Sequence, residues 1–143
     1  MARVLVTGGA GYIGSHTCVA LLEAGYEVAV LDSLVNSSAD AIDAVGEIAG
    51  HRPRLDEADC RDESAVEKVI TEVHPDAVLH FAGLKSVPDS VADPLRYYRH
   101  NLESTAVLLT VMERCGVRRI VFSSSATVYG EPDELPVPET APT

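Results

Sequence analysis

Glycine residues near the start of the chain have the spacing of a phosphate-binding turn. Residues 7–14 read Thr-Gly-Gly-Ala-Gly-Tyr-Ile-Gly, which fits G-x-G-x-x-G from Gly9 and G-x-x-G-x-x-G from Gly8. Glycine lets the backbone turn tightly and approach a pyrophosphate, and the N-terminus of a following helix adds N–H donors and partial positive charge. The pattern predicts a dinucleotide site. Its expected contacts are Gly8, Gly11, Tyr12, Ile13 and Gly14.

An aspartate follows this turn at the distance expected for a ribose contact. Asp32 lies 18 residues after Gly14, at the end of the next apolar run. Its carboxylate can accept hydrogen bonds from the adenosine ribose and would repel a 2′-phosphate, so the pattern favours NAD over NADP. The same side chain could instead cap the loop 33–38, as aspartates in turns often do.

A second aspartate has two possible roles. Asp59 ends a later apolar run, where its carboxylate could reach the adenine amino group while Cys60 packs on the ring. It could equally cap a helix that begins near Asp62. The residue pattern leaves both roles open.

Apolar runs of strand length alternate with periodic segments of helix length along the chain, which is typical of a parallel sheet with crossover helices. We therefore expect an α/β fold, a doubly wound parallel sheet of the Rossmann type, with strands covered on both faces. The predicted strands are 3–7, 27–31, 54–58, 77–81 and 119–123. The predicted helices are 13–24, 37–50, 62–73 and 94–115.

The apolar periodicity also predicts which helix faces are buried. In the first helix we expect Ile13, Thr17, Ala20, Leu21 and Ala24 to point inward. In the second we expect Ile42, Val45 and Ile48. In the third we expect Val66, Val69, Ile70 and Val73. In the long helix we expect Leu95, Leu102, Ala106, Leu109 and Met112.

Charge and composition exclude several classes of partner. The chain has 143 residues, enough for one domain, and its 11 basic and 22 acidic side chains give a net charge of −11. That charge opposes binding to nucleic acid or an anionic membrane. The first residues do not resemble a signal peptide, and no run has membrane-spanning length. Three widely spaced cysteines predict reduced thiols and a cytoplasmic location, and the five histidines lack metal-ligand spacing.

The composition changes after Gly130. Four prolines between 131 and 143 leave little scope for regular structure. We therefore expect a dinucleotide-binding domain over 1–130 and a Pro-rich loop or tail over 131–143.

The motifs together resemble the extended short-chain dehydrogenase family, and within it the UDP-glucose 4-epimerases most closely. The resemblance covers the chain up to the tail. Besides the glycine turn, the matching stretches are Cys18, Asp32, Asn36 and Ser37, Asp59, 80–85, Pro94 and Leu95, Tyr97 and Tyr98, Asn101, and 122–130. The chain departs from the family pattern at His100, and at Ser104, where the family has glycine.

The resemblance implies roles for individual residues. It implies adenine and ribose contacts from Asp32, Asn36, Ser37, Asp59 and Cys60. It implies pocket-wall contacts from Phe81, Ala82 and Gly83, and a nicotinamide contact from Ser123. It also implies that Lys85 lies near the nicotinamide ribose and the UDP-sugar substrate, and that catalytic Ser125 binds the sugar hydroxyl that is oxidised. Without the resemblance, Lys85 could be an ordinary solvated cation, and the three serines at 123–125 could accept hydrogen bonds from the N–H groups of a following turn.

The implied reaction interconverts UDP-glucose and UDP-galactose through a 4-keto intermediate, with NAD as cofactor. The family's base lies in a Tyr-x-x-x-Lys pair, and no tyrosine here has a lysine four residues later. We therefore expect a chain truncated before that pair, the last strands and the substrate lobe. Alone it should be inactive, although the full-length enzyme should form a homodimer. Alternatives are a nucleotide-sugar dehydratase or decarboxylase, disfavoured by Ala126 and Thr127, and a non-catalytic NAD-binding module.

Overall fold

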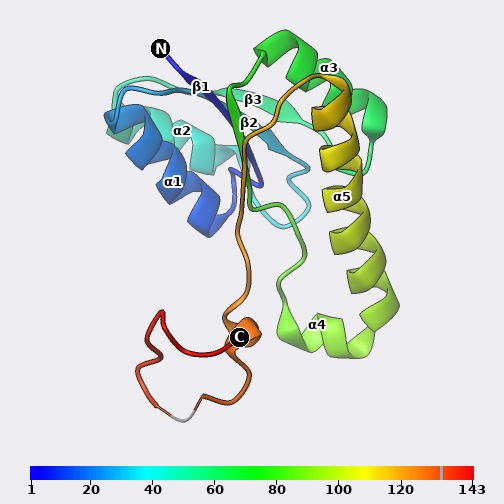
Figure 1. The fold of residues 1–143 in the computed structure, drawn as a ribbon. Helices are drawn as coiled ribbons and strands as arrows, with labels where there is room; N and C mark the ends of the chain where they lie inside the picture. Colours follow the sequence, from blue (N-terminus) through cyan, green and yellow to red (C-terminus); the bar gives the residue numbers. More distant parts are fainter. Residues whose placement is uncertain (133) are drawn as a thin grey trace.

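Five parallel strands form one sheet in the computed structural model, which describes residues 1–132 and 134–143 (Figure 1). The strands are β1 (Arg3–Thr7), β2 (Glu27–Asp32), β3 (Arg54–Glu57), β4 (Ala77–His80) and β5 (Ile120–Phe122). They lie in the order β3-β2-β1-β4-β5. After β3 the chain crosses to the other side of β1, so the strand order reverses at β1, where ligands of such sheets bind. The predicted fold class is confirmed.

Helices cover both faces of this sheet. Figure 1 shows α1 (Tyr12–Glu23) and α2 (Ala39–Ala49) on one face, and α3 (Glu63–Val73) and α5 (Pro94–Arg114) on the other. The short helix α4 (Val87–Ala92) and the 3₁₀ helix η1 (Ala126–Tyr129) lie beyond the carboxyl ends of the strands. Neither short helix was predicted.

Each face of the sheet has its own apolar core, because successive strand residues point to opposite sides. On the α1 and α2 side the buried residues are Val4, Val6, Ala10, Cys18, Val28, Val30, Ile42 and Val45. On the α3 and α5 side they are Leu5, Ala29, Leu31, Cys60, Val66, Val69, Ile70, Val73, Val78, Leu108, Val111 and Met112. Burial on both faces explains why these strands lack polar alternation.

The predicted buried faces of three helices need correction. In α1 the buried residues are Gly14 and Cys18, whereas Ile13, Ala20 and Ala24 are exposed. The reason is that Gly14 must contact the glycine turn, and this contact sets the rotation of the helix. In α2, Ile42 and Val45 are buried as predicted but Ile48 is exposed. The predicted buried face of α3 is confirmed.

In α5 the prediction is confirmed for Met112, but its other residues form the wrong apolar stripe. Leu95, Leu102 and Leu109, spaced by seven residues, are exposed, and so is Ala106. The stripe that packs on the sheet and α3 consists of Ser104, Leu108, Val111 and Met112. A helix with two apolar stripes gives a periodicity that fits either one, so the pattern could not choose between them.

The far edge of the sheet is less covered than predicted. In β5 only Ile120 is partly buried, while Val121 and Phe122 are exposed. The prediction that strands are covered on both faces is therefore wrong for β5, since it pairs only with β4 within the described residues. Beyond η1, residues 131, 132 and 134–143 contain no helix or strand.

Candidate functional site

A cavity of about 330 Å³ opens at the carboxyl ends of β1, β2 and β4, within the size range of small-ligand pockets. It collects most of the residues that the sequence singled out. Those in its wall are Gly8, Gly11, Tyr12, Ile13, Gly14, Asp32, Asn36, Asp59, Cys60, Phe81, Ala82, Gly83, Lys85 and Ser123. Ser37 and Ser125 are not part of the wall.

The glycine turn follows the longer of its two possible spacings. Gly8, with φ +72°, and Gly14 both face the pocket, and Gly8 lies so close to the β4 loop that an added Cβ would sit 2.5 Å from the nitrogen of Ala82. At Gly14 a Cβ would sit 2.2 Å from the carbonyl oxygen of Gly8. Gly9 instead faces Val30. The frame Gly8, Gly11 and Gly14 is therefore the one that shapes the cavity.

The first turn of α1 leaves its backbone donors free for a ligand. Among the α-helices of the described residues, α1 is the one without a side-chain cap, and its first turn has no acidic residue. The others are capped by Ser38, Asp62, Ser86 and Asp93. The first N–H groups of a helix have no intrahelical acceptor, and the helix dipole adds positive potential there. This end of the pocket suits an anion.

Asp32 holds the loop after β2 and still faces the cavity. Its side chain is 7% exposed, and it accepts hydrogen bonds from Ala10 N at 2.9 Å, Leu34 N at 2.9 Å and Ser37 Oγ at 2.8 Å. A carboxylate offers about four acceptor positions, so these bonds leave capacity on Oδ2 for one ribose hydroxyl. The loop-capping role and a ribose contact are therefore compatible.

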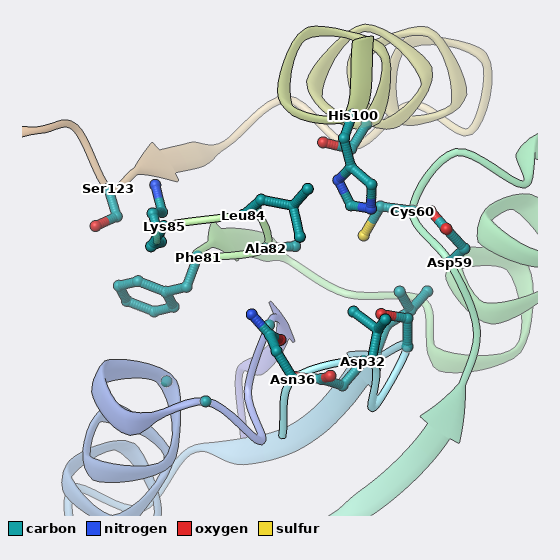
Figure 2. A pocket seen from close by; sticks show the side chains of 18 of the residues that line it. Asp32, Asn36, Asp59, Cys60, Phe81, Ala82, Leu84, Lys85, His100 and Ser123 are labelled. Atoms are coloured by element: carbon teal, nitrogen blue, oxygen red, sulfur yellow. The ribbon is translucent and has the colours of Figure 1, made fainter. Parts of the chain in front are cut away.

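The two polar residues of this loop have different places. Asn36 lies in the cavity wall, where Figure 2 shows its side chain beside Asp32. Ser37 is outside the wall and binds Asp32 instead. A direct cofactor contact from Ser37 is thus not favoured by the geometry, and its contact with the site runs through the Asp32 carboxylate.

The capping alternative for Asp59 is wrong. The residue that caps α3 is Asp62, which accepts a hydrogen bond from Ala65 N at 3.1 Å. Asp59 lies in the cavity wall and pairs with the Arg61 guanidinium at 2.6 Å. This pairing holds the pKa of Asp59 below its usual range. Next to it, burial raises the pKa of Cys60 to about 12, so Cys60 presents a neutral thiol.

His100 and Ser104, which the sequence marked as departures from the family pattern, both belong to the cavity wall. They lie one turn apart on α5, on the side that faces the sheet, and the correct rotation of α5 would have identified them. Burial, with a contribution from Arg61, lowers the pKa of His100. The remaining unpredicted wall residues are Leu31, Ser33, Val35, Ala58 and Leu84.

The opposite end of the cavity is formed by Phe81, Lys85 and Ser123, as Figure 2 shows. The loop between β4 and α4 is fixed there by Asn101 of α5. The Asn101 side chain accepts from Leu84 N at 2.8 Å and donates to Leu84 O at 3.1 Å. Lys85 is exposed at the mouth, so its ammonium group is accessible to a ligand.

Ser125 lies outside this cavity. It is exposed and caps η1, with its Oγ 2.7 Å from Thr127 Oγ1 and accepting from Thr127 N at 3.3 Å. Ser125 therefore has the alternative role predicted for the serines after β5, in which they accept hydrogen bonds from N–H groups of the following turn. Its contact with a sugar hydroxyl stays a prediction.

Residues 1–132 and 134–143 contain neither a metal-binding cluster nor a membrane-spanning helix. No group of three or more His, Cys, Asp or Glu side chains is arranged to hold a metal ion there. No helix in the same residues is both long and apolar enough to cross a membrane. All three cysteines are free thiols.

The fold and the site together define a dinucleotide-binding domain of the Rossmann type, with a glycine turn, an uncapped helix N-terminus and an acidic residue ending the second strand. Comparison with known families is more specific. The chain belongs to the NAD dependent epimerase/dehydratase family, whose model matches residues 4–143.

Individual relatives are similar over nearly the whole chain. UDP-glucose 4-epimerase of Bacillus subtilis is 58% identical over 139 residues, covering 97% of this chain and 41% of that protein. The solved structure of UDP-glucose 4-epimerase from Bifidobacterium longum, in complex with NAD⁺ and UDP, is 51% identical. It has a TM-score of 0.93 and covers 99% of this chain and 42% of that one.

A second solved structure agrees. UDP-glucose-4-epimerase from Stenotrophomonas maltophila, with bound NAD and formylated UDP-arabinopyranose, has a TM-score of 0.94 and 50% identity over all of this chain and 43% of that one. The chain thus spans about two fifths of the length of the relatives it matches.

Proposed function

We propose that this chain binds NAD and forms the NAD-binding part of a UDP-hexose 4-epimerase that interconverts UDP-glucose and UDP-galactose. The observation that carries the proposal is the cavity in which the uncapped first turn of α1 and the Asp32 carboxylate form part of one wall. The relatives' names and the NAD bound in two similar structures support the cofactor and the reaction.

In this proposal each end of the cavity binds one half of the cofactor. The N–H groups of α1 hold the pyrophosphate, and Asp32 accepts a hydrogen bond from the adenosine ribose. Asp59, Cys60 and His100 surround the adenine. Phe81, Lys85 and Ser123 then lie at the nicotinamide end. Bound NAD would supply the chemistry of accepting a hydride from the sugar and returning it.

The UDP-sugar would approach from the nicotinamide end, near Lys85. Ser125 would hold the C4 hydroxyl, which requires the segment after Ser123 to bring its Oγ to the substrate. The 143 residues contain no Tyr-x-x-x-Lys pair to supply the base. We therefore expect this chain, by itself, to bind NAD without interconverting UDP-glucose and UDP-galactose.

Calorimetry with oxidised cofactors tests the binding proposal. NAD titrated into the folded chain should release or absorb heat with one site, and NADP should bind at least about tenfold more weakly because its 2′-phosphate meets Asp32. Circular dichroism confirms folding beforehand. A folded chain that gives no binding signal with NAD would overturn the proposal, and equal affinity for NADP would overturn the role of Asp32.

We further propose that the full-length protein forms a homodimer through the exposed stripe of α5. Leu95, Tyr98, Leu102 and Leu109 are large, apolar and exposed along one side of that helix, and such a continuous stripe favours a protein partner. Sedimentation should show a dimer of the full-length protein that dissociates when Leu102 is changed to Glu but not when exposed Thr110 is. A cytoplasmic location is consistent with the three free thiols.

A further inference from the structure

One fully buried ionisable side chain has no part in the proposed cofactor contacts. His80 ends β4, is 1% exposed, and lies between the end of β1 and the inner side of α5. Its Nδ1 is 2.6 Å from Thr7 Oγ1 and its Nε2 is 3.0 Å from Thr105 Oγ1. The imidazole therefore bridges two strands of the sheet and one helix.

The neighbouring hydrogen bonds determine where its proton lies. Thr105 Oγ1 donates its only proton to the backbone oxygen of Asn101, at 3.0 Å. Towards His80 this hydroxyl can only accept, so Nε2 of His80 must carry the proton. Nδ1 is then unprotonated and accepts a hydrogen bond from the Thr7 hydroxyl group. The imidazole is neutral, with a defined tautomer.

This bridge continues to the cofactor-facing loop. Thr7 directly precedes Gly8 of the glycine turn, and Asn101 clamps both backbone groups of Leu84, next to Lys85. Hydrogen bonds therefore run from Thr7 through His80 and Thr105 to the backbone oxygen of Asn101, and the side chain of the same Asn101 holds Leu84 in the loop. Together they connect the pyrophosphate end of the cavity with the loop of its nicotinamide end.

We propose that His80 is a positioning residue: as the neutral Nε2–H tautomer it joins β1 and β4 to α5, and through Thr105 and Asn101 it fixes the loop that carries Lys85. For its binding consequence this inference rests on the proposed NAD site. The surroundings support a neutral ring, because burial and the nearby Lys85 lower the pKa of His80 to about 4. The Phe122 ring, 5.8 Å away between centroids, adds an apolar neighbour from β5.

A histidine that only filled the core would behave differently. It would need no defined tautomer, and removing the hydroxyl of Thr105 would leave the loop and the cofactor affinity unchanged. The substitution Thr105→Val keeps the shape of the side chain and deletes only the link. Thr110→Val is the matched control, because Thr110 makes the same bond to a carbonyl four residues earlier, to Ala106 at 2.9 Å, on an exposed part of α5.

The experiment uses ¹⁵N-labelled full chain at pH 7. Long-range ¹H–¹⁵N spectra should show His80 Nε2 protonated and Nδ1 unprotonated in the wild type. Thr105→Val should shift the amide signals of Leu84 and Lys85 and weaken NAD binding at least threefold by calorimetry. Thr110→Val should do neither. A protonated Nδ1, or unmoved loop signals in Thr105→Val, would overturn the inference.

A second pair of variants tests His80 itself. His80→Gln retains an amide donor towards Thr105, whereas His80→Met has similar length and no donor. Gln should retain more NAD affinity than Met, and equal affinities would count against the bridge. The tautomer is read on the wild type, so it stays testable if either variant fails to fold. A wild type with the expected tautomer but no NAD binding would instead refute the proposed function alone.

Discussion

Replacing Gly14 with alanine tests whether close backbone approach, rather than helix propensity, sets the start of α1. An added Cβ would lie 2.2 Å from the Gly8 oxygen and 2.7 Å from the Gly9 Cα. Ordinary contact requires α1 and the turn to separate by roughly 1 Å. Both partners are backbone, so no side chain can move aside.

The magnitude follows from two opposing effects. Alanine in a helix gains about 1 kcal/mol over glycine, whereas overpacking against immobile atoms costs about 3 kcal/mol or more. The free energy of unfolding should therefore fall by about 2 kcal/mol or more. A 1 Å displacement also breaks hydrogen bonds from α1 to a pyrophosphate, and losing one of about 1.5 kcal/mol weakens NAD binding about tenfold.

Urea unfolding followed by circular dichroism measures the first effect, and calorimetry with NAD measures the second. Gly11→Ala is the stability control, because its Cβ would meet only the Gly8 oxygen, at 3.3 Å, and its φ of −74° suits alanine. That variant should lose less than about 1 kcal/mol. An unchanged urea midpoint for Gly14→Ala, or an equal loss for Gly11→Ala, would refute the reasoning.

Three further predictions concern other residues. The pKa of His80 is about 4 in the folded chain, whereas the ordinary pKa of an exposed histidine is 6.5. Below pH 7 the unfolded chain therefore binds more protons than the folded chain. Acidification to pH 4.5 should therefore cost the wild type about 2.5 kcal/mol more than His80→Gln in urea titrations. Asp32→Asn replaces one acceptor oxygen by a donor, so it should lower the free energy of unfolding by about 2 kcal/mol. The same change should reduce the preference for NAD over NADP in calorimetry. Leu108→Ala should lose about 3 kcal/mol because Leu108 is 0% exposed, whereas Leu109→Ala, at a residue 46% exposed, should lose below about 1 kcal/mol in the same assay; equal losses would contradict the assigned face of α5.

The sequence was sufficient for the fold class because the strands, the helices between them and the cofactor turn depend on local signals. The glycine spacing, Asp32 and the apolar runs are each readable within a few residues, and the parallel sheet follows from their alternation. The rotation of a helix is not local in this sense. Leu109 and Leu108 are adjacent leucines, and only the contact with α3 and the sheet decides which one is buried.

The same limit explains which residues of the cavity wall the sequence did not indicate. His100 and Ser104 face the cavity because α5 turns that side to the sheet, and polar residues at such positions give no apolar signal. Ser125 follows β5 closely in sequence, but it caps η1 and is not part of the cavity wall. Residues at strand ends were thus easier to place than residues on a helix or beyond a short edge strand.

Because the chain is strongly acidic, the uncapped N-terminus of α1 is important for binding a pyrophosphate. With a net charge of −11, the chain as a whole repels a pyrophosphate, and Arg61, which is not part of the cavity wall, is already paired with Asp59. Lys85 is exposed and lies at the other end. Attraction at the centre of the cavity must therefore come from dipoles, namely the free N–H groups of α1 and its positive end. Dipoles act over short range, so one such site can bind a dinucleotide although the net charge opposes the approach of polyanions at long range.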